Sequence, residues 1–141
     1  MSDSTTLPSI LEYSEDVSTA EAPPPLPARI YPAQVVGASA KVSKNTGNMY
    51  VNLLTRISPD AYPVDYTMGN PDGTTLPYNR TIIADTYEGR YRMRLLCEAL
   101  GVQPSRNVDL NQFMGCACRV EIVHDKFEGV DRHQINAVLH P

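Results

Sequence analysis

The position of the one predicted helix among the predicted strands constrains the fold of this chain most. Strand-like stretches, rich in Val, Ile, Thr and Tyr or alternating between apolar and polar residues, precede and follow that helix. The predicted strands are 30–42, 49–57, 80–85, 116–124 and 131–139, and the predicted helix is 88–100. This layout is that of an OB-type fold, whose open face commonly binds oligonucleotides or oligosaccharides. The predicted fold class is therefore all-β: an OB-like five-stranded barrel with one α-helix between strands 3 and 4.

The helix and the first hairpin have the clearest local signals. The apolar residues of the helix follow the i, i+3, i+4, i+7 spacing of a single stripe, namely Met93, Leu96, Cys97 and Leu100. Gly101 follows directly, as expected of a C-terminal cap. Between the first two strands, residues 43–48 contain the Asn and Gly that supply positive φ angles, so the two strands are predicted to form a hairpin.

The chain is long enough for one domain, and its charge divides it into two parts. Residues 1–28 contain Asp and Glu but no Lys or Arg, whereas residues 29–141 hold all 12 basic residues. The first segment is also rich in Ser, Thr and Pro, a composition that buries too little apolar surface to fold. We therefore predict a disordered acidic, Pro-rich arm over 1–28 and a folded domain over 29–141. The one apolar patch of the arm, residues 10–13, is suited to dock on a partner or on the barrel.

The second predicted strand has two different faces, because successive side chains of a strand point to opposite sides. One face is mostly apolar and is the predicted core face; it holds Met49, Val51, Leu53, Thr55 and Ile57. The other face holds Tyr50, Asn52, Leu54 and Arg56. It is expected to offer an aromatic ring, an amide and a cation to solvent.

A proline-rich segment, residues 58–79, follows the second strand and contains Tyr62, Tyr66 and Tyr78. Loops of about 20 residues without regular structure are uncommon in compact domains and are usually functional or mobile. A short extra strand over 64–68 is the alternative interpretation of this segment.

Basic residues interleaved with aromatic residues are the positive functional signal. Single-stranded nucleic acids bind through cations on the phosphates and through flat rings that stack on the bases, at about 1–3 kcal/mol per base. The predicted DNA-binding residues are Lys41, Lys44, Tyr50, Asn52, Arg56, Tyr62, Tyr66, Tyr78 and Arg80. Two other interpretations stay open: tyrosines are also common in half-buried strands, and the helix arginines, Arg90, Arg92 and Arg94, also fit a solvated helix face.

Catalytic and metal-binding patterns are weak. The chain lacks a nucleophile elbow, a phosphate-binding glycine loop and a histidine pair at metal-binding helical spacing. Cys97, Cys116 and Cys118 are not spaced like the paired ligands of structural zinc sites, so we expect buried, inert thiols in a reducing compartment. His124 and His133 are expected to face each other across the last turn as polar neighbours. We therefore predict a protein that is not an enzyme and has no metal or other cofactor.

Four runs of sequence resemble a known family. They are residues 26–35, residues 41–53, residues 94–101 and residues 120–129. These runs are similar to those of a family of small phage-encoded OB-fold-type single-stranded DNA-binding proteins found among replication and recombination genes. The resemblance covers a hairpin turn, a helix end and the final turn, and so concerns the fold more than the chemistry.

The resemblance implies a non-catalytic, largely sequence-independent single-stranded DNA-binding protein that acts in phage DNA replication or recombination. Its expected location is the cytoplasm of the infected bacterial host, because no apolar run reaches the roughly 18 residues of a membrane span. The expected partners are single-stranded DNA and, through the arm, replication or recombination proteins; formation of a homo-oligomer stays open. The alternative function is a phage protein-interaction or virion-associated module that uses the same β-face to bind a protein.

Overall fold

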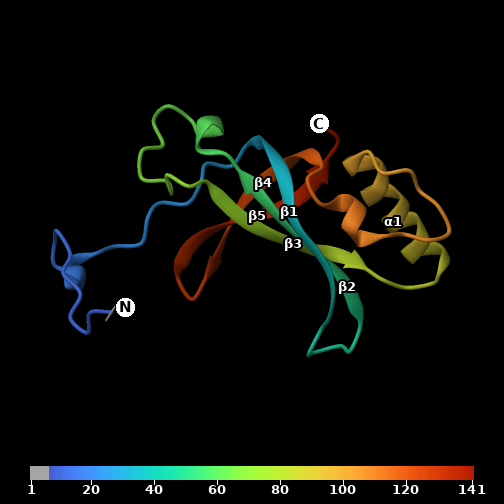
Figure 1. The fold of residues 1–141 in the computed structure, drawn as a ribbon, viewed down its shortest axis with the longest axis horizontal. Helices are drawn as coiled ribbons and strands as arrows, with labels where there is room; N and C mark the ends of the chain where they lie inside the picture. Colours follow the sequence, from blue (N-terminus) through green and yellow to red (C-terminus); the bar gives the residue numbers. More distant parts are fainter. Residues whose placement is uncertain (1–6) are drawn as a thin grey trace, which may run out of the picture.

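The computed structural model describes residues 7–141 (Figure 1). Its strands are β1 Ile30–Val42, β2 Met49–Ile57, β3 Thr74–Ile82, β4 Ala117–Phe127 and β5 Val130–Leu139. The α-helix is α1 Tyr87–Leu100, and three short 3-10 turns are η1 Val17–Thr19, η2 Pro59–Ala61 and η3 Leu110–Phe113. The predicted layout, mostly β with the helix between the third and fourth strands, is confirmed.

The strands form one antiparallel sheet in the order β3-β2-β1-β4-β5. β1 is the central strand: residues 30–34 pair with β4, and residues 34–42 pair with β2. The sheet is strongly twisted, and α1 lies beyond one end of it, on the right in Figure 1. The two edge strands, β3 and β5, contact each other, and α1 contacts both. No hydrogen-bonded ladder joins β3 to β5 in the part of the chain that the structure describes.

The third strand lies earlier in the sequence than predicted. It runs from Thr74 to Ile82 rather than over 80–85, and it contains Pro77 opposite Leu54 of β2. A proline within a strand is tolerated at a sheet edge, where the missing N–H faces away from the neighbouring strand. β3 is such an edge strand. Residues 64–68 form no strand, so the alternative extra strand is not present.

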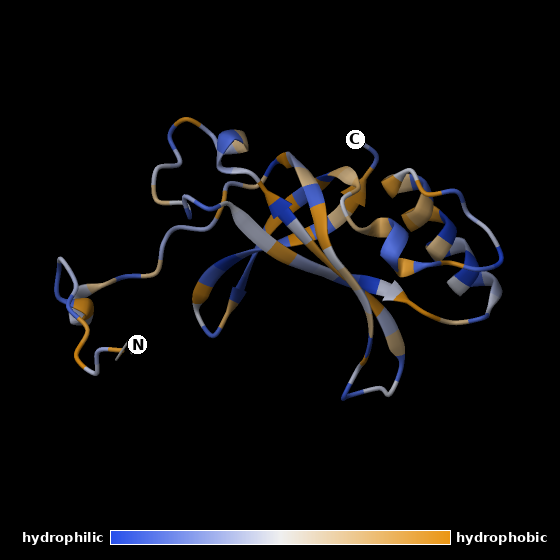
Figure 2. Ribbon diagram, viewed as in Figure 1, coloured by the Kyte–Doolittle hydropathy of each residue, from blue (hydrophilic) through white to orange (hydrophobic). Residues whose placement is uncertain are grey.

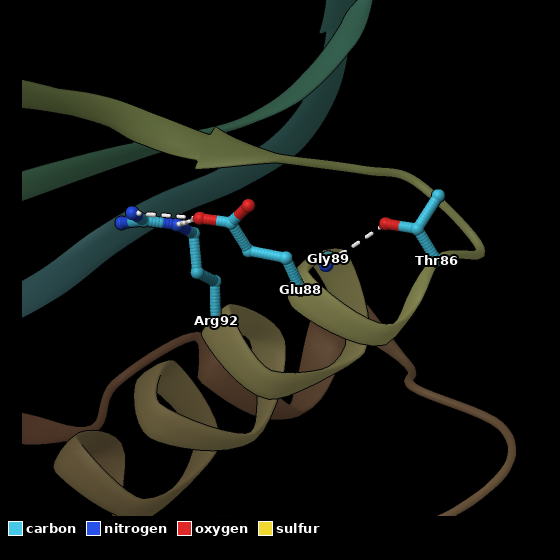
Figure 3. A network of polar contacts seen from close by, with 4 residues as sticks. All are labelled: Thr86, Glu88, Gly89 and Arg92. Carbon is cyan, nitrogen blue, oxygen red and sulfur yellow. Dashed lines mark hydrogen bonds and ion pairs between the residues drawn. The ribbon is translucent and has the colours of Figure 1, made fainter.

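The start and end of α1 follow from its capping residues, and Figure 3 shows the contacts at its start. The Thr86 hydroxyl accepts a hydrogen bond from the Gly89 N–H at 3.0 Å, and Glu88 pairs with Arg92 one turn later at 3.1 Å. A Cβ at position 89 would collide with the carbonyl oxygen of Ala84, so glycine lets the chain cross close to the first turn. At the other end Gly101 has φ 73° and caps the helix, as predicted.

The core lies between the inner face of the twisted sheet, α1 and η3. Its largest fully buried side chains include Phe113 of η3, Leu53 and Ile57 of β2, and Ile122 of β4. Leu96 and Leu100 of α1 cover it, which confirms the apolar stripe predicted for the helix. Hydrophobic and hydrophilic residues accordingly alternate along the strands, and the β1–β2 turn is hydrophilic (Figure 2).

The packed part of the chain begins before the predicted boundary at residue 29. Leu26 is fully buried in the core. Its N–H donates to Nδ1 of His133 at 2.7 Å, and its carbonyl oxygen accepts from Nε2 of His124 at 2.7 Å. The two histidines do face each other across the last turn, as expected, but they also anchor this segment. Residues 7–24 are exposed and extend away from the sheet (Figure 1), and the rest of the predicted arm, residues 1–6, lies outside the described residues.

Candidate nucleic-acid interface

The strands β1, β2 and β3 present one face away from the core, and we call it the outer face. Residues paired across an antiparallel ladder project to the same side, so each row of the sheet can be assigned from the register. One row contains Lys41, Tyr50 and Ile82, and another, at the opposite end of the strands, contains Gln34, Arg56 and Thr75. The rows between them hold Leu54 with Gly37, and Asn52 with Ser39. The inner rows, such as Val51 with Thr81, are buried as predicted. Met49, at the start of β2, was predicted on this core face but is 49% exposed.

A hollow of about 620 Å³ lies at the end of the outer face next to the β1–β2 turn, and we call it the hairpin pocket. Its main lining side chains are Lys41, Lys44, Tyr50, Asn79 and Ile82. The remaining lining residues are Val42 and the turn residues Ser43, Thr46 and Asn48. The pocket therefore combines two ammonium groups, one aromatic ring and amide groups from two chain segments.

The turn that forms this pocket satisfies its own backbone. The Ser43 N–H donates to the Asn48 carbonyl oxygen at 2.8 Å, and the Gly47 N–H donates to the Ser43 carbonyl oxygen at 2.8 Å. Gly47 has φ 74°, a conformation that glycine adopts without strain. Neither Lys41 nor Lys44 has an ion-pair partner among residues 7–141. Their charges are therefore available to an external anion.

Asn52 does not contribute as expected. It is only 9% exposed, so the prediction that its amide is offered on the outer face is wrong. The register between β2 and β3 shifts between Val51 and Leu53, which leaves Asn52 opposite two residues of β3. The strand amide that lines the pocket is instead that of Asn79, which sequence reasoning missed because the third strand was predicted too late in the chain.

The predicted site residues of the 58–73 loop, at the other end of strands β2 and β3, pack against the core and are held by local contacts. The Tyr62 hydroxyl lies 2.7 Å from the Thr74 hydroxyl and donates to the Asn70 carbonyl oxygen at 3.0 Å. The Tyr66 hydroxyl donates to the carbonyl oxygen of Pro24 at 2.9 Å. The two rings pack edge to face, with centroids 5.3 Å apart. Burial, with a smaller effect of Tyr62, raises the pKa of Tyr66.

Arg56 belongs to this second group. Its Nε and Nη2 both donate to the carbonyl oxygen of Asp72, at 3.0 and 2.7 Å. The 58–73 loop is thereby fixed to β2 and, through Tyr66, to the segment that contains Pro24. The tyrosines and the arginine of this region stabilise the loop instead of lining the hairpin pocket.

Tyr78 and Arg80 are also separate from the hairpin pocket. Tyr78 is opposite Leu53 in the register, so it lies on the inner side and packs against the core. Arg80 lines a smaller hollow of about 180 Å³ between β3, β5 and α1, together with Arg92. Of the nine predicted residues, the structure brings Lys41, Lys44 and Tyr50 into one hollow.

One aromatic group that sequence reasoning missed lies on the β4–β5 turn. Phe127 is 55% exposed, and the guanidinium of Arg132 lies 4.7 Å from the centroid of its ring. In the view of Figure 1 this turn and the β1–β2 turn both point to the lower side. The available signal in the sequence was an aromatic residue in the turn between two predicted strands.

The cysteines have no environment that activates a thiol. Cys97 and Cys118 are buried, and burial raises the pKa of Cys118 to about 11 and that of Cys97 in the same direction. The half-buried Cys116 donates to the Gln112 carbonyl oxygen. Within residues 7–141 there is no group of three or more side chains placed to hold a metal ion, and no helix that is long and apolar enough to cross a membrane.

Comparison with known proteins adds no assignment. No model of a known protein family matches the chain, and no curated protein matches it. The function is therefore inferred from the residues and their geometry.

Proposed function

We propose that this protein is a non-catalytic, largely sequence-independent single-stranded DNA-binding protein with an OB-like barrel, acting in phage DNA replication or recombination. The observation that carries the proposal is the hairpin pocket. Lys41 and Lys44 have no ion-pair partner in the described chain, and they adjoin the ring of Tyr50 and the amide of Asn79. Backbone phosphates require cations, and unstacked bases require flat surfaces.

The place of this pocket in the fold supports the same function. OB folds bind oligonucleotides on the face of strands 2 and 3 and with the loops that join strands 1–2 and 4–5. The hairpin pocket lies where the β1–β2 turn meets β2 and β3. The other turn carries the exposed Phe127. The sheet order and the contact between β3 and β5 support the proposed barrel.

The surface between these groups is suited to bases that stack without sequence preference. Gly37 lies beside Leu54 on the outer face, and a Cβ there would approach the Leu54 side chain to 3.1 Å. The glycine therefore leaves the side chain of Leu54, which is 37% exposed, as apolar surface that a base can contact. Contacts of this kind favour any flat ring and do not select a base. The proposed location, the cytoplasm of an infected bacterium, follows from this role and from the resemblance to the phage family.

Fluorescence anisotropy with labelled single-stranded and duplex oligonucleotides of equal length tests the proposal. At low salt we expect tighter binding to the single strand. Lys41→Ala/Lys44→Ala should reduce the slope of log affinity against log salt by about 1.4, at about 0.7 per phosphate contact. Arg29→Ala/Arg119→Ala removes two exposed cations outside the pocket and is the matched control. Binding to neither oligonucleotide would refute the proposal.

A protein-interaction or virion-associated module is the second candidate. It is favoured by the apolar side chains near the same pocket, since Val42 is 60%, Met49 49% and Ile82 47% exposed. Contiguous apolar surface is typical of protein-binding sites. Under this function, Val42→Ser and Ile82→Ser would abolish partner binding, whereas under the proposed function they would weaken DNA binding much less than Tyr50→Ala.

A further inference from the structure

A groove of about 730 Å³ lies on the α1 side of Ile82, between α1 and the segments that precede and follow it. Its floor is apolar and consists of side chains that pack against the core from outside: Ile83, Met93, Val108 and Leu110. Tyr50 and the two pocket lysines do not reach it. The groove therefore differs in chemistry from the hairpin pocket, which is lined mainly by polar side chains.

The rim of the groove is basic. It carries three arginines, Arg90, Arg94 and Arg106, and one carboxylate, that of Asp85. Arg90 pairs with Asp85, and Arg94 pairs with Glu98, but all four side chains are largely exposed, and such pairs contribute only about 0–1 kcal/mol. Arg106 has no ion-pair partner in the described chain. An incoming carboxylate can therefore bind at the rim without opposition from a strong internal ion pair.

The exposed arm has the complementary chemistry. Ile10 is 80%, Leu11 65% and Tyr13 68% exposed, so their apolar surface is not buried against the chain's own domain. Glu12 and Glu15 lie among them, and no basic residue occurs before Arg29. An apolar anchor flanked by carboxylates matches an apolar floor flanked by arginines.

The arm and the groove lie at opposite ends of the molecule (Figure 1). The arm leaves the sheet near Pro24, whose carbonyl oxygen is held by Tyr66, and α1 is at the far end. Residues 14–25 separate the apolar patch from Leu26, a spacer of about 40 Å when extended. The arm is thus directed away from its own groove and is long enough to reach a second molecule.

We propose that residues 10–15 of one copy bind the α1 groove of a second copy. Ile10, Leu11 and Tyr13 contact the apolar floor, and Glu12 and Glu15 pair with the rim arginines. Donor and acceptor surfaces differ and lie at opposite ends, so the contact is heterologous and forms open head-to-tail chains. Short-segment interfaces are small and therefore weak in free solution. When two copies are bound next to one another on a DNA strand, the arm of one is held close to the groove of the other. The high effective concentration strengthens their association.

This association goes beyond the proposed function and requires no DNA, so it is tested with protein alone. Sedimentation velocity of the full chain over a concentration series should show self-association that Ile10→Ser/Leu11→Ser abolishes. Arg106→Glu should raise the dissociation constant about tenfold or more, the equivalent of about 1.4 kcal/mol. Val17→Ser, in the exposed arm, and Arg119→Glu, an exposed cation outside the groove, are the matched controls.

A mixing experiment tests whether the arm of one copy binds the groove of another. Ile10→Ser/Leu11→Ser has an intact groove, and Arg106→Glu has an intact arm. At a concentration near the wild-type dissociation constant, each variant alone should be mostly monomeric, and their mixture should form a one-to-one complex and nothing larger. A Glu12→Arg substitution should restore association with the Arg106→Glu groove.

Three results would overturn the proposal. The first is a monomeric wild-type protein at all concentrations, and the second is variants that do not associate when mixed. The third is a groove whose NMR signals shift with a single-stranded oligonucleotide while the protein stays monomeric, which would assign the groove to the DNA path instead. Failure of DNA binding in the anisotropy experiment would leave this proposal intact, because the two readouts are independent.

Discussion

The two ends of strands β2 and β3 have the same kinds of residue near them, in different surroundings. At the hairpin end, Lys41, Lys44 and Tyr50 line an open hollow. At the loop end, Arg56, Tyr62 and Tyr66 donate hydrogen bonds to backbone carbonyl oxygens of the loop and of the N-terminal segment. Only the hairpin end has cations and a ring available for a ligand.

The difference arises from how the backbone N–H and C=O groups at each end find hydrogen-bond partners. A tight turn pairs its own N–H and C=O groups, as Ser43 and Asn48 do, and leaves its side chains free. A long irregular loop leaves carbonyl oxygens without ladder partners, and nearby hydroxyl and guanidinium groups bind them. Aromatic and basic composition therefore indicates a binding site more reliably beside a short turn than within a long loop.

The largest expected effect concerns Leu26, which is buried in the core and fixes the N-terminal segment beside the 58–73 loop. Leu26→Ala creates a cavity in the core and should lower the free energy of unfolding by about 2–5 kcal/mol. Chemical denaturation followed by far-UV circular dichroism measures it. A chain shortened to begin at Pro23 keeps the anchor and should match the full chain. Equal stability of Leu26→Ala and wild type would show that this segment is not part of the packed domain.

Tyr62→Ala should have the next largest effect on stability. It removes a ring packed against Tyr66 and two hydroxyl contacts, and we expect a loss of about 2–3 kcal/mol in unfolding free energy. Tyr62→Phe keeps the ring and should lose about 1 kcal/mol. In a folded Tyr62→Phe protein, oligonucleotide affinity should equal that of wild type. A large loss of affinity there would make the loop end part of the binding surface.

Tyr50→Ala should have the opposite effect: it should weaken DNA binding and leave stability almost unchanged. DNA binding should weaken by about 1–3 kcal/mol while the salt slope stays constant, because a stacking surface is lost and no charge changes. The free energy of unfolding should change little, since Tyr50 lies on the outer face. Tyr50→Phe, the matched control, should bind like wild type. A Tyr50→Ala protein that unfolds would place this ring in the core.

Lys44 and Arg56 offer a paired test at the two ends. Lys44→Ala should reduce the salt slope by about 0.7, the value for one phosphate contact on a single strand. Arg56→Ala should leave the slope unchanged and lower stability instead, because its guanidinium is engaged by the Asp72 carbonyl oxygen. Both quantities come from anisotropy titrations at several salt concentrations and from denaturation. If the two variants had equal salt slopes, the two ends would not differ in their contacts with phosphates.

The smallest expected effect is a pH dependence of stability, which arises from the contact between His133 and Leu26. Burial, and to a lesser extent His124, lowers the pKa of His133 below its ordinary value of 6.5. The unfolded chain then binds more protons than the folded one below about pH 6.5, so stability should fall as the pH decreases through that value. Protonated Nδ1 also no longer accepts from the Leu26 N–H. Melting temperatures between pH 7 and pH 5 should decrease more for wild type than for His133→Gln; equal decreases would contradict this.

Periodic elements could be predicted from the sequence, and isolated contacts could not. The stripe from Met93 to Leu100 has a fixed spacing, and Gly101 marks its end, so the bounds of α1 differ from the prediction by one residue. β3 was misplaced because Pro77 interrupts its pattern, although an edge strand tolerates it. Leu26 is one apolar residue among prolines and has no period to detect.

The candidate site was predictable in part for a related reason. Lys41, Lys44 and Tyr50 lie within one hairpin, so their proximity follows from local sequence. Tyr66 is held by a carbonyl oxygen 42 residues earlier in the chain, and nothing in the sequence around either group indicates that contact. Burial of Asn52 depends on a register shift that alternation alone does not contain.

Pro77 also limits how these chains aggregate. Because proline has no N–H to donate, its backbone nitrogen at the middle of β3 cannot extend the sheet to a strand of another molecule. Arg80 adds a charge three residues further along the same edge strand, beside Arg92. Under the proposed function, many copies would lie close together on one DNA strand, where an unblocked edge would favour β-sheet growth between neighbours. At the β3 edge, contacts with another copy are therefore restricted mainly to side chains, which dissociate more readily than a shared sheet.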